Sequence, residues 1–341
     1  MKLDREYLRS RHRLSHQQID RLLNESISKD FIKEKLDALK MVKEFIQIAD
    51  LLNNHHIPFI SIKGPLLSQI VYGDPSVRFS HDLDILVDRE NVNKIHNILL
   101  SNGYELGYGP AWPTKKSHQD YFAEQVHHIV FRNTTSGTNI ELHWTLISSP
   151  PISQKKLHKI IAENTTTISF GERKFRVLNH ELNLAYLIIH GAKHGWQRLK
   201  WLVDIKDYPL DRVNAKQFHQ LIEILNSRKA VAQVGLLLKH YWGIENPLFP
   251  TDAISANCYL MRHTLNKINA PVEESISLRM ALKDFRYKLQ IFDGILYTWR
   301  VIRLALFSAA DLERISLPNK MLYYIYRPYS FIKRRMIYAN R

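Results

Sequence analysis

The chain has 341 residues, of which 45% are hydrophobic, so it is long enough for two packed domains or for one domain with a helical extension. Its single cysteine, Cys258, excludes an internal disulfide framework and a cysteine-rich zinc site. The formal net charge of +15 attracts polyanions such as nucleoside triphosphates, nucleic acid or anionic lipid. The polar N-terminus and the lack of an apolar run of roughly 18 residues predict a soluble, cytoplasmic protein.

Apolar residues at near-helical spacing mark the first part of the chain, from about residue 15 to residue 54. This spacing predicts an N-terminal helical cap over residues 1–55. The period then changes to that of a sheet, and residues 56–150 form the predicted catalytic core. Its elements are a strand over 58–62, a helix over 65–72, a strand over 82–87, a helix over 91–102, and strands over 125–132 and 138–145.

Helices dominate the second half of the sequence. A hairpin over 166–177 turns at Gly171 and lies in a predicted connecting segment, residues 151–179. Beyond it the apolar spacing is helical, and prolines divide a C-terminal domain, residues 180–341, into separate helices. The expected fold class is therefore α+β, with a small mixed sheet between N-terminal helices and a helical C-terminal domain.

Two aspartates on one predicted strand carry the strongest chemical signal. Because side chains alternate along a strand, Asp82 and Asp84 share one face while Leu83 and Ile85 point into the core. Adjacent like charges are costly unless a cation neutralises them, and carboxylate oxygens suit magnesium or manganese. The alternative is an exposed strand edge with its acidic residues facing solvent.

Three neighbouring features favour a metal-dependent phosphate site. The turn Lys63-Gly64 opens a helix, which directs backbone N–H groups and a helix dipole towards a bound phosphate. Arg78 lies shortly before the aspartates, where its guanidinium could hold a triphosphate. Glu141 and His143 share a face of a later strand, so a third carboxylate joins the pair if the two strands are neighbours.

Several sequence runs together resemble one protein family. They are Ile62-Lys63-Gly64-Pro65-Leu66-Leu67, Val71-Tyr72-Gly73-Asp74-Pro75, Arg78, Asp82-Leu83-Asp84-Ile85-Leu86-Val87, Glu141-Leu142-His143-Trp144, and residues 190–201 with Asp204. They resemble the uncharacterised nucleotidyltransferase family of bacteria, a branch of the DNA polymerase β-like superfamily. The resemblance covers most of residues 58–330. It implies a polymerase β-like core in which Gly64, Asp82, Asp84 and Glu141 take the turn and carboxylate positions of the superfamily.

The resemblance also implies a reaction. A nucleoside monophosphate would pass from a triphosphate, with ATP the leading donor, to an unidentified hydroxyl on a small molecule, glycan precursor, protein or RNA end. Asp82 and Asp84 would bridge two ions, and Glu141 would complete the site beside the acceptor. Magnesium is the expected cofactor and manganese the alternative.

Donor binding involves a wider set of residues. Pro65 lacks an N–H, so the phosphate cradle departs from the Gly-Ser or Gly-Gly turn of many superfamily members and needs other donors. The resemblance extends to a segment near residue 194 that would border the nucleotide or acceptor pocket. The expected nucleotide-binding residues are Lys63, Gly64, Arg78, His194, Trp196 and Arg198.

Other histidines have simpler interpretations. His190 and His194 share a helical face, as two zinc ligands would, but the sequence offers no third ligand. His127 and His128 alternate across a strand, so only one of them is expected to face the cleft and a structural role is favoured for both. His81 is expected to point away from the face that carries the aspartates and is assigned no role.

The C-terminal tail leaves a second class of function open. Residues 321–335 mix aromatic and basic side chains, as segments that contact nucleic acid or an anionic membrane surface do. Alternatively, the aromatics pack on the helical domain while Lys333, Arg334 and Arg335 stay solvated. A catalytically silent module with the same fold, docking through its basic surface, is the competing hypothesis. The three clustered carboxylates favour the enzyme, because a binding module has no need of mutually repelling acids.

Overall fold

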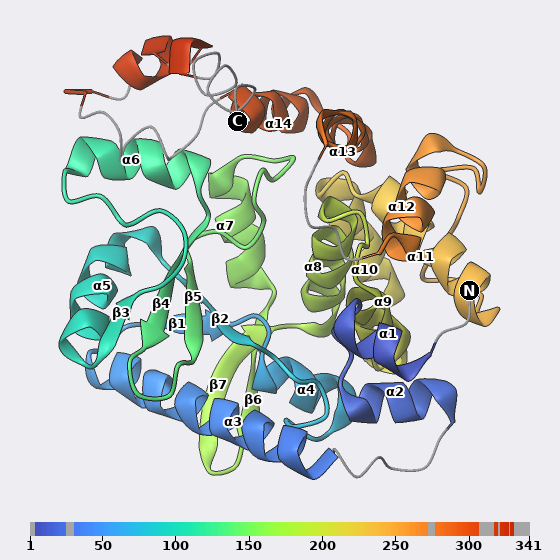
Figure 1. The fold of residues 1–341 in the computed structure, drawn as a ribbon, viewed down its shortest axis with the longest axis horizontal. Coiled ribbons are helices and arrows are strands. Elements are labelled where there is room, and N and C mark those ends of the chain that lie inside the picture. Colours follow the sequence, from blue (N-terminus) through green and yellow to red (C-terminus); the bar gives the residue numbers. More distant parts are fainter. Residues whose placement is uncertain are drawn as a thin grey trace.

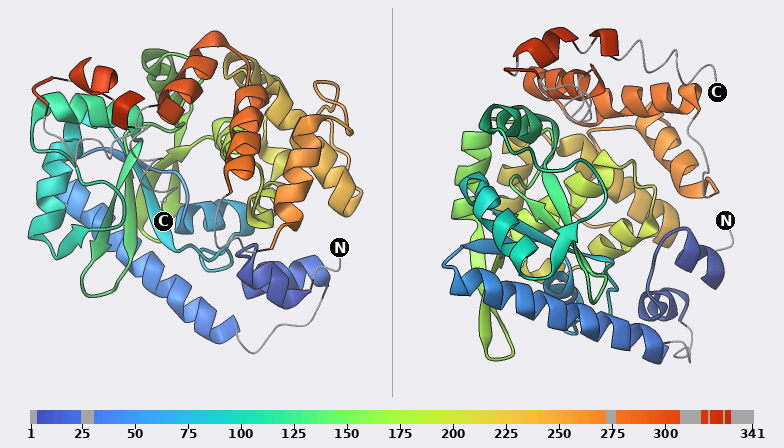
Figure 2. Two further views of the ribbon diagram at one scale, coloured as in Figure 1. Left: turned by 45° about the horizontal axis from the view of Figure 1, so that its top comes forward. Right: turned by 60° about the vertical axis from the view of Figure 1, so that its left-hand side comes forward.

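A mixed sheet and a group of helices lie side by side in the computed structural model, which describes residues 4–24, 31–271, 277–306, 317–319, 321–326 and 328–330. Figure 1 shows the strands on one side of the molecule and helices α8 to α12 on the other. The two further views in Figure 2 show the same separation. The catalytic residues expected from the sequence fall where these two parts meet.

Seven strands form the sheet, in the order β3-β4-β5-β2-β1-β7-β6. They are β1 (Phe59–Ser61), β2 (Asp82–Val87), β3 (Tyr104–Leu106), β4 (His128–Asn133), β5 (Asn139–His143), β6 (Thr165–Phe170) and β7 (Arg173–Leu178). Strand β2 pairs parallel with β5 and antiparallel with β1, and β1 pairs parallel with β7. The mixed sheet and its surrounding helices confirm the α+β class.

Helices occupy both ends of the chain and the crossovers within the sheet. They are α1 (Arg5–Ser10), α2 (His16–Leu23), α3 (Phe31–Asn54), α4 (Pro65–Tyr72), α5 (Val92–Ser101), α6 (Lys116–Gln125), α7 (Gln154–Glu163), α8 (His180–Lys193), α9 (Leu199–Lys206), α10 (Ala215–Ile224), α11 (Arg228–Trp242), α12 (Tyr259–Asn269), α13 (Leu278–Ile291) and α14 (Ile295–Leu306). Short 3₁₀ turns occur at Arg89–Asn91 and Leu210–Arg212.

Each face of the sheet belongs to a different hydrophobic core. Leu83, Ile85 and Val87 of β2 pack with α3 and α5 on one face. Leu86, on the opposite face, joins the core that is built mainly from α8, α9 and α11. The alternation predicted for β2 is therefore confirmed, and the face that carries Asp82 and Asp84 looks towards the C-terminal helices.

Several elements differ from the sequence-based expectation. The hairpin β6–β7 extends the sheet next to β1 instead of only linking two domains, since Ser61 pairs with Val177. The N-terminal segment divides, because α3 packs beneath the sheet whereas α1 and α2 pack against the C-terminal helices. Helices α6 and α7 replace irregular chain, and β4 starts at His128, three residues later than expected.

The described part of the tail packs on α6. The ring of Tyr323 is fully buried and stacks on Tyr121 of α6 at a centroid distance of 5.0 Å. The basic cluster Lys333, Arg334 and Arg335 lies outside the described residues. Within the described part of the chain, no helix combines the length and the apolar character that crossing a membrane requires.

Candidate active site

The register of two parallel strands brings two carboxylates together. Asp84 of β2 lies directly beside Glu141 of β5. Side-chain alternation then puts Asp82, Asp84 and Glu141 on the face that looks towards α8. Hydrophobic side chains at Leu83 and Ile140 anchor the opposite face in the core, so burial of the strands fixes the direction of the carboxylates.

Asp84 is the centre of a network of charged side chains. The Nε2 of His143 lies 3.2 Å from Oδ1 of Asp84 and 3.3 Å from Oε2 of Glu141. The ammonium of Lys63 lies 3.7 Å from the same Asp84 oxygen. Burial alone would raise the pKa of Asp84, but Lys63 and His143 hold it well below its usual range. Asp84 is therefore ionised near neutral pH.

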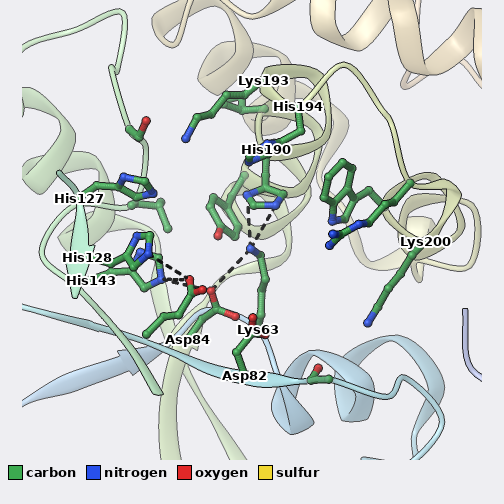
Figure 3. Close-up of a pocket in the computed structure, with 18 of the residues that line it drawn as sticks. Lys63, Asp82, Asp84, His127, His128, His143, His190, Lys193, His194 and Lys200 are labelled. Atoms are coloured by element: carbon green, nitrogen blue, oxygen red, sulfur yellow. Dashed lines mark hydrogen bonds and ion pairs between the residues drawn. The ribbon is translucent and has the colours of Figure 1, made fainter. Parts of the chain in front are cut away.

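Lys63 reaches this network from the turn between β1 and α4. Its Nζ lies 3.3 Å from Nδ1 of His190 on α8, between that ring and Asp84 (Figure 3). Burial opposes the charged form, yet the Asp84 carboxylate raises the pKa of Lys63 above its usual value. Because Nζ of Lys63 lies 3.3 Å and 3.4 Å from the two ring nitrogens of His190, that imidazole is already engaged, which argues against a zinc site at His190 and His194.

Asp82 is less well compensated, because Lys63 and Lys200 lower its pKa only in part. It faces the same cavity, but among the described residues no basic side chain lies within the 4.0 Å of an ion pair. Burial, followed by repulsion from Asp84 and Glu141, raises the pKa of Asp82 to about 6. The folded protein thus holds a partly buried carboxylate that a bound cation would stabilise.

A polar cavity of about 340 Å³ lies above these carboxylates, between the sheet and helices α8 and α9. Three acidic residues line it, together with six histidines and six lysines or arginines. The basic residues are Arg13, Lys63, Arg78, Lys193, Arg198 and Lys200. Burial lowers the pKa of both Lys193 and Lys200 to about 7. This concentration of basic groups suits a polyanionic ligand that extends away from the carboxylates.

The structure gives Arg78 a different task from the one expected. Its Nε lies 2.9 Å from each carboxylate oxygen of Asp204, and its Nη1 donates to Oγ of Ser80 at 2.9 Å. Arg78 is 5% exposed and Asp204 fully buried. The guanidinium reaches the cavity wall, and through Nε and Nη1 it fixes α9 against the segment before β2.

Two other expected nucleotide-binding residues do not line the cavity. The ring of Trp196 is fully buried, donates from Nε1 to Gln233 and packs against Gly191, so it braces α8 instead of touching a ligand. Gly64 caps α4 with φ +70°, a conformation that side chains other than glycine rarely adopt. A Cβ added at Gly64 would contact the Leu83 side chain and the backbone of β2. Gly64 therefore shapes the turn that positions Lys63.

The histidines are closer to the site than expected. His194 and Arg198 line the cavity, as the sequence suggested, and both contact the ring of Trp201. His127 and His128 both line it as well, because β4 begins only at His128 and strand alternation does not apply to the residue before it. His81 also reaches the cavity wall from just before β2.

Sequence reasoning assigned no role to several cavity residues. His143 had a detectable signal, because it shares a strand face with Glu141 two residues away. Arg13 had none, and Lys193 and Lys200 lie in the run 190–201 that carries the family resemblance but were assigned no role. The fold brings these three residues to the cavity from the loop after α1, from α8 and from α9. Tyr108, whose hydroxyl donates to Glu141 at 3.0 Å, comes from the loop after β3.

A sequence family model identifies the family of this chain. No curated protein sequence matches the chain. The solution structure of the antibiotic-resistance factor ANT(2'')-Ia aligns with a TM-score of 0.39 and 11% identity over 60% of this chain and 97% of that chain. The crystal structure of ANT(2'')-Ia with adenylyl-2''-tobramycin gives a TM-score of 0.36 and 10% identity over 55% and 98%. A family model for uncharacterised nucleotidyltransferases matches residues 9–243, well over half of the sequence. The chain therefore belongs to the uncharacterised nucleotidyltransferase family and is an enzyme of the nucleotidyltransferase class.

Proposed function

We propose that the enzyme transfers a nucleoside monophosphate from a nucleoside triphosphate to a hydroxyl acceptor, with divalent metal ions held by Asp82, Asp84 and Glu141. One observation carries the proposal: three carboxylates share one face of adjacent parallel strands at the floor of a cavity with six lysines and arginines. A cation-lined cavity alone would suit any polyanion. The three carboxylates on the cavity floor are better explained by a reaction on phosphate than by simple binding of a polyanion.

The donor set fits magnesium or manganese. Ligand atoms of Asp84, Glu141 and His143 lie within 4.8 Å of one another, and oxygens dominate when Asp82 is included. The absence of an ion pair at Asp82 among the described residues leaves one negative charge for a cation to balance. When bound, the ions would lower the pKa of the acceptor hydroxyl and neutralise charge on the leaving pyrophosphate.

The protein's own residues position the reactants. Lys193, Lys200 and Arg198 would bind the phosphates of the donor, ATP in the first instance, from the α8 and α9 side. Lys63 and His143 hold the Asp84 carboxylate in place. Glu141 or Asp84 would accept the acceptor proton, because both groups are ionised near neutral pH. Their lowered pKa values make them weak bases, so this transfer depends on bound ions lowering the pKa of the acceptor hydroxyl.

A labelled-donor assay tests the proposal. Full-length protein is incubated with each α-³²P-labelled nucleoside triphosphate, magnesium or manganese, and panels of hydroxyl acceptors, and transferred label and released pyrophosphate are both measured. The proposal expects metal-dependent transfer of label with one pyrophosphate released per event. Absence of transfer to every acceptor, together with absence of magnesium binding by calorimetry, would instead support the silent binding module.

A further inference from the structure

Three imidazoles line one wall of the cavity. His128, the first residue of β4, pairs across the strands with His143, the last residue of β5, and His127 precedes His128. Ring centroids are 4.5 Å apart for His127 and His128, 4.9 Å for His128 and His143, and 5.7 Å for His127 and His143. One ring nitrogen from each lies within 4.8 Å of the other two. Figure 3 shows the three rings gathered beside Asp84.

Two of these rings carry unsatisfied polar atoms. Within the described chain, Nδ1 of His128 and Nδ1 of His143 are buried and have no hydrogen-bond partner. His143 is only 5% exposed, so solvent does not replace the missing partner. Buried polar atoms are normally paired, and exceptions call for an explanation such as a ligand. The neighbouring carboxylate of Glu141 lies 3.3 Å from His143 and 3.9 Å from His128.

We propose that His127, His128 and His143 form a nitrogen-rich site for a transition-metal ion of the zinc type. Three imidazoles are a donor set that divalent zinc and cobalt accept in tetrahedral geometry with the fourth position open, whereas magnesium prefers oxygen. The donors of this site are nitrogens, whereas those of the proposed magnesium centre are mainly oxygens. The three imidazoles define it whether or not nucleotide transfer occurs.

The donor atoms change in order across three neighbouring strands. Strand β4 and the residue before it supply His127 and His128, β5 supplies both Glu141 and His143, and β2 supplies only carboxylates. Glu141 therefore lies between a nitrogen-rich and an oxygen-rich region of the same sheet face. The alternative pair His190 and His194 is unsuited to a cation, because the Lys63 ammonium lies against His190.

Cobalt binding to the full-length protein tests the site. Protein stripped with a chelator is titrated with Co²⁺, whose visible absorption is intense in tetrahedral nitrogen ligation and weak in octahedral oxygen ligation. We expect intense bands that saturate at one equivalent, disappear on addition of zinc and persist in excess magnesium. Weak octahedral absorption only, or loss of the bands to magnesium, would overturn the proposal.

Paired variants locate the ligands. His127→Gln with His128→Gln should weaken cobalt binding about a hundredfold or more, because even outer-sphere changes cost metal sites about ten- to a hundredfold. The matched control replaces another adjacent pair, His55 and His56, which are exposed at the end of α3. Control binding at wild-type affinity supports the site. Equal losses in both pairs, or no loss in either, contradict it.

A second measurement remains informative even if the histidine variants do not fold. Crystals of the wild-type protein soaked in zinc should show anomalous density between the three imidazoles, and density elsewhere or none would refute the site. Asp82→Asn separates this proposal from the proposed function, because Asp82 is not one of the three ligands. Its cobalt spectrum should stay unchanged, whereas loss of the spectrum in this variant would place the metal at the carboxylates.

Discussion

Arg78→Ala distinguishes a structural ion pair from a phosphate-binding arginine. The side chain is 5% exposed, and its Nε bonds both oxygens of the fully buried Asp204. Removing the guanidinium leaves an uncompensated charge in the interior, which typically costs about 3–5 kcal/mol. At about 1.4 kcal/mol per decade, the unfolding equilibrium constant should rise between about a hundredfold and a few thousandfold.

Urea unfolding followed by circular dichroism measures this loss. The double variant Arg78→Met with Asp204→Leu removes both charges and retains apolar volume, so it should recover much of the stability that the single variant loses. Arg198→Ala is the matched comparison, since Arg198 lines the same cavity and has no ion pair within 4.0 Å among the described residues. It should lower triphosphate affinity with little effect on unfolding.

The reverse pattern would refute the structural role of Arg78. If Arg78→Ala unfolded at the wild-type urea concentration but bound triphosphate and metal more weakly by calorimetry, the guanidinium would be a donor ligand. The pair with Asp204 would then be a contact that the ligand replaces. Equal triphosphate affinity in the folded fraction of Arg78→Ala is the expected result.

Three further predictions concern packing and protonation. Gly191→Ala should lower the thermal unfolding midpoint, since a Cβ there would lie 2.3 Å from the Trp196 ring and overpacking costs about 1–3 kcal/mol; an unchanged midpoint would contradict the packing. Triphosphate binding at pH 8 should take up protons, because Lys193 and Lys200 have pKa values of about 7 and nearby phosphates raise them; calorimetry in buffers of different ionisation enthalpy measures the uptake, and proton release would contradict it. The pKa of Asp82, raised from 3.8 to about 6, stabilises the fold below pH 4, and this contribution is lost as the pH rises through 6. Wild type should therefore lose stability relative to Asp82→Asn between pH 4 and 7 in urea unfolding, and a constant difference would refute the shift.

The parts of the structure that could be predicted from the sequence are those that local periodicity determines. Strand alternation placed Leu83 and Ile85 in the core and gave Asp82 and Asp84 a common direction. The pairing of β2 with β5 was an expectation from family resemblance, and the register of Asp84 with Glu141 now fixes it in the structure. Both inferences depend on local rules. Side chains alternate along one strand, and the polar side chains of paired strands must point away from the hydrophobic core.

Contacts between residues far apart in the sequence could not be predicted, because sequence patterns do not specify tertiary neighbours. Arg78 and Asp204 are 126 residues apart, and nothing near Arg78 signals that its charge is taken by a helix in the other half of the chain. The family resemblance suggested Trp196 as a pocket residue, but a contact with Gly191 buries its ring. Lys193 and Lys200 were assigned no role, and only the packing of α8 and α9 against the sheet brings them to the cavity.

Nucleotide transfer by Asp82→Asn tests the central claim most directly. The variant keeps the size of the side chain, and the wild-type carboxylate has no ion pair to lose among the described residues, so the fold should survive. Asp88→Asn, an exposed change just after the same strand, is the control. With labelled triphosphate and magnesium, Asp82→Asn should lose about a thousandfold or more in rate while Asp88→Asn transfers at the wild-type rate. Transfer by folded Asp82→Asn at the wild-type rate would contradict the assigned metal centre.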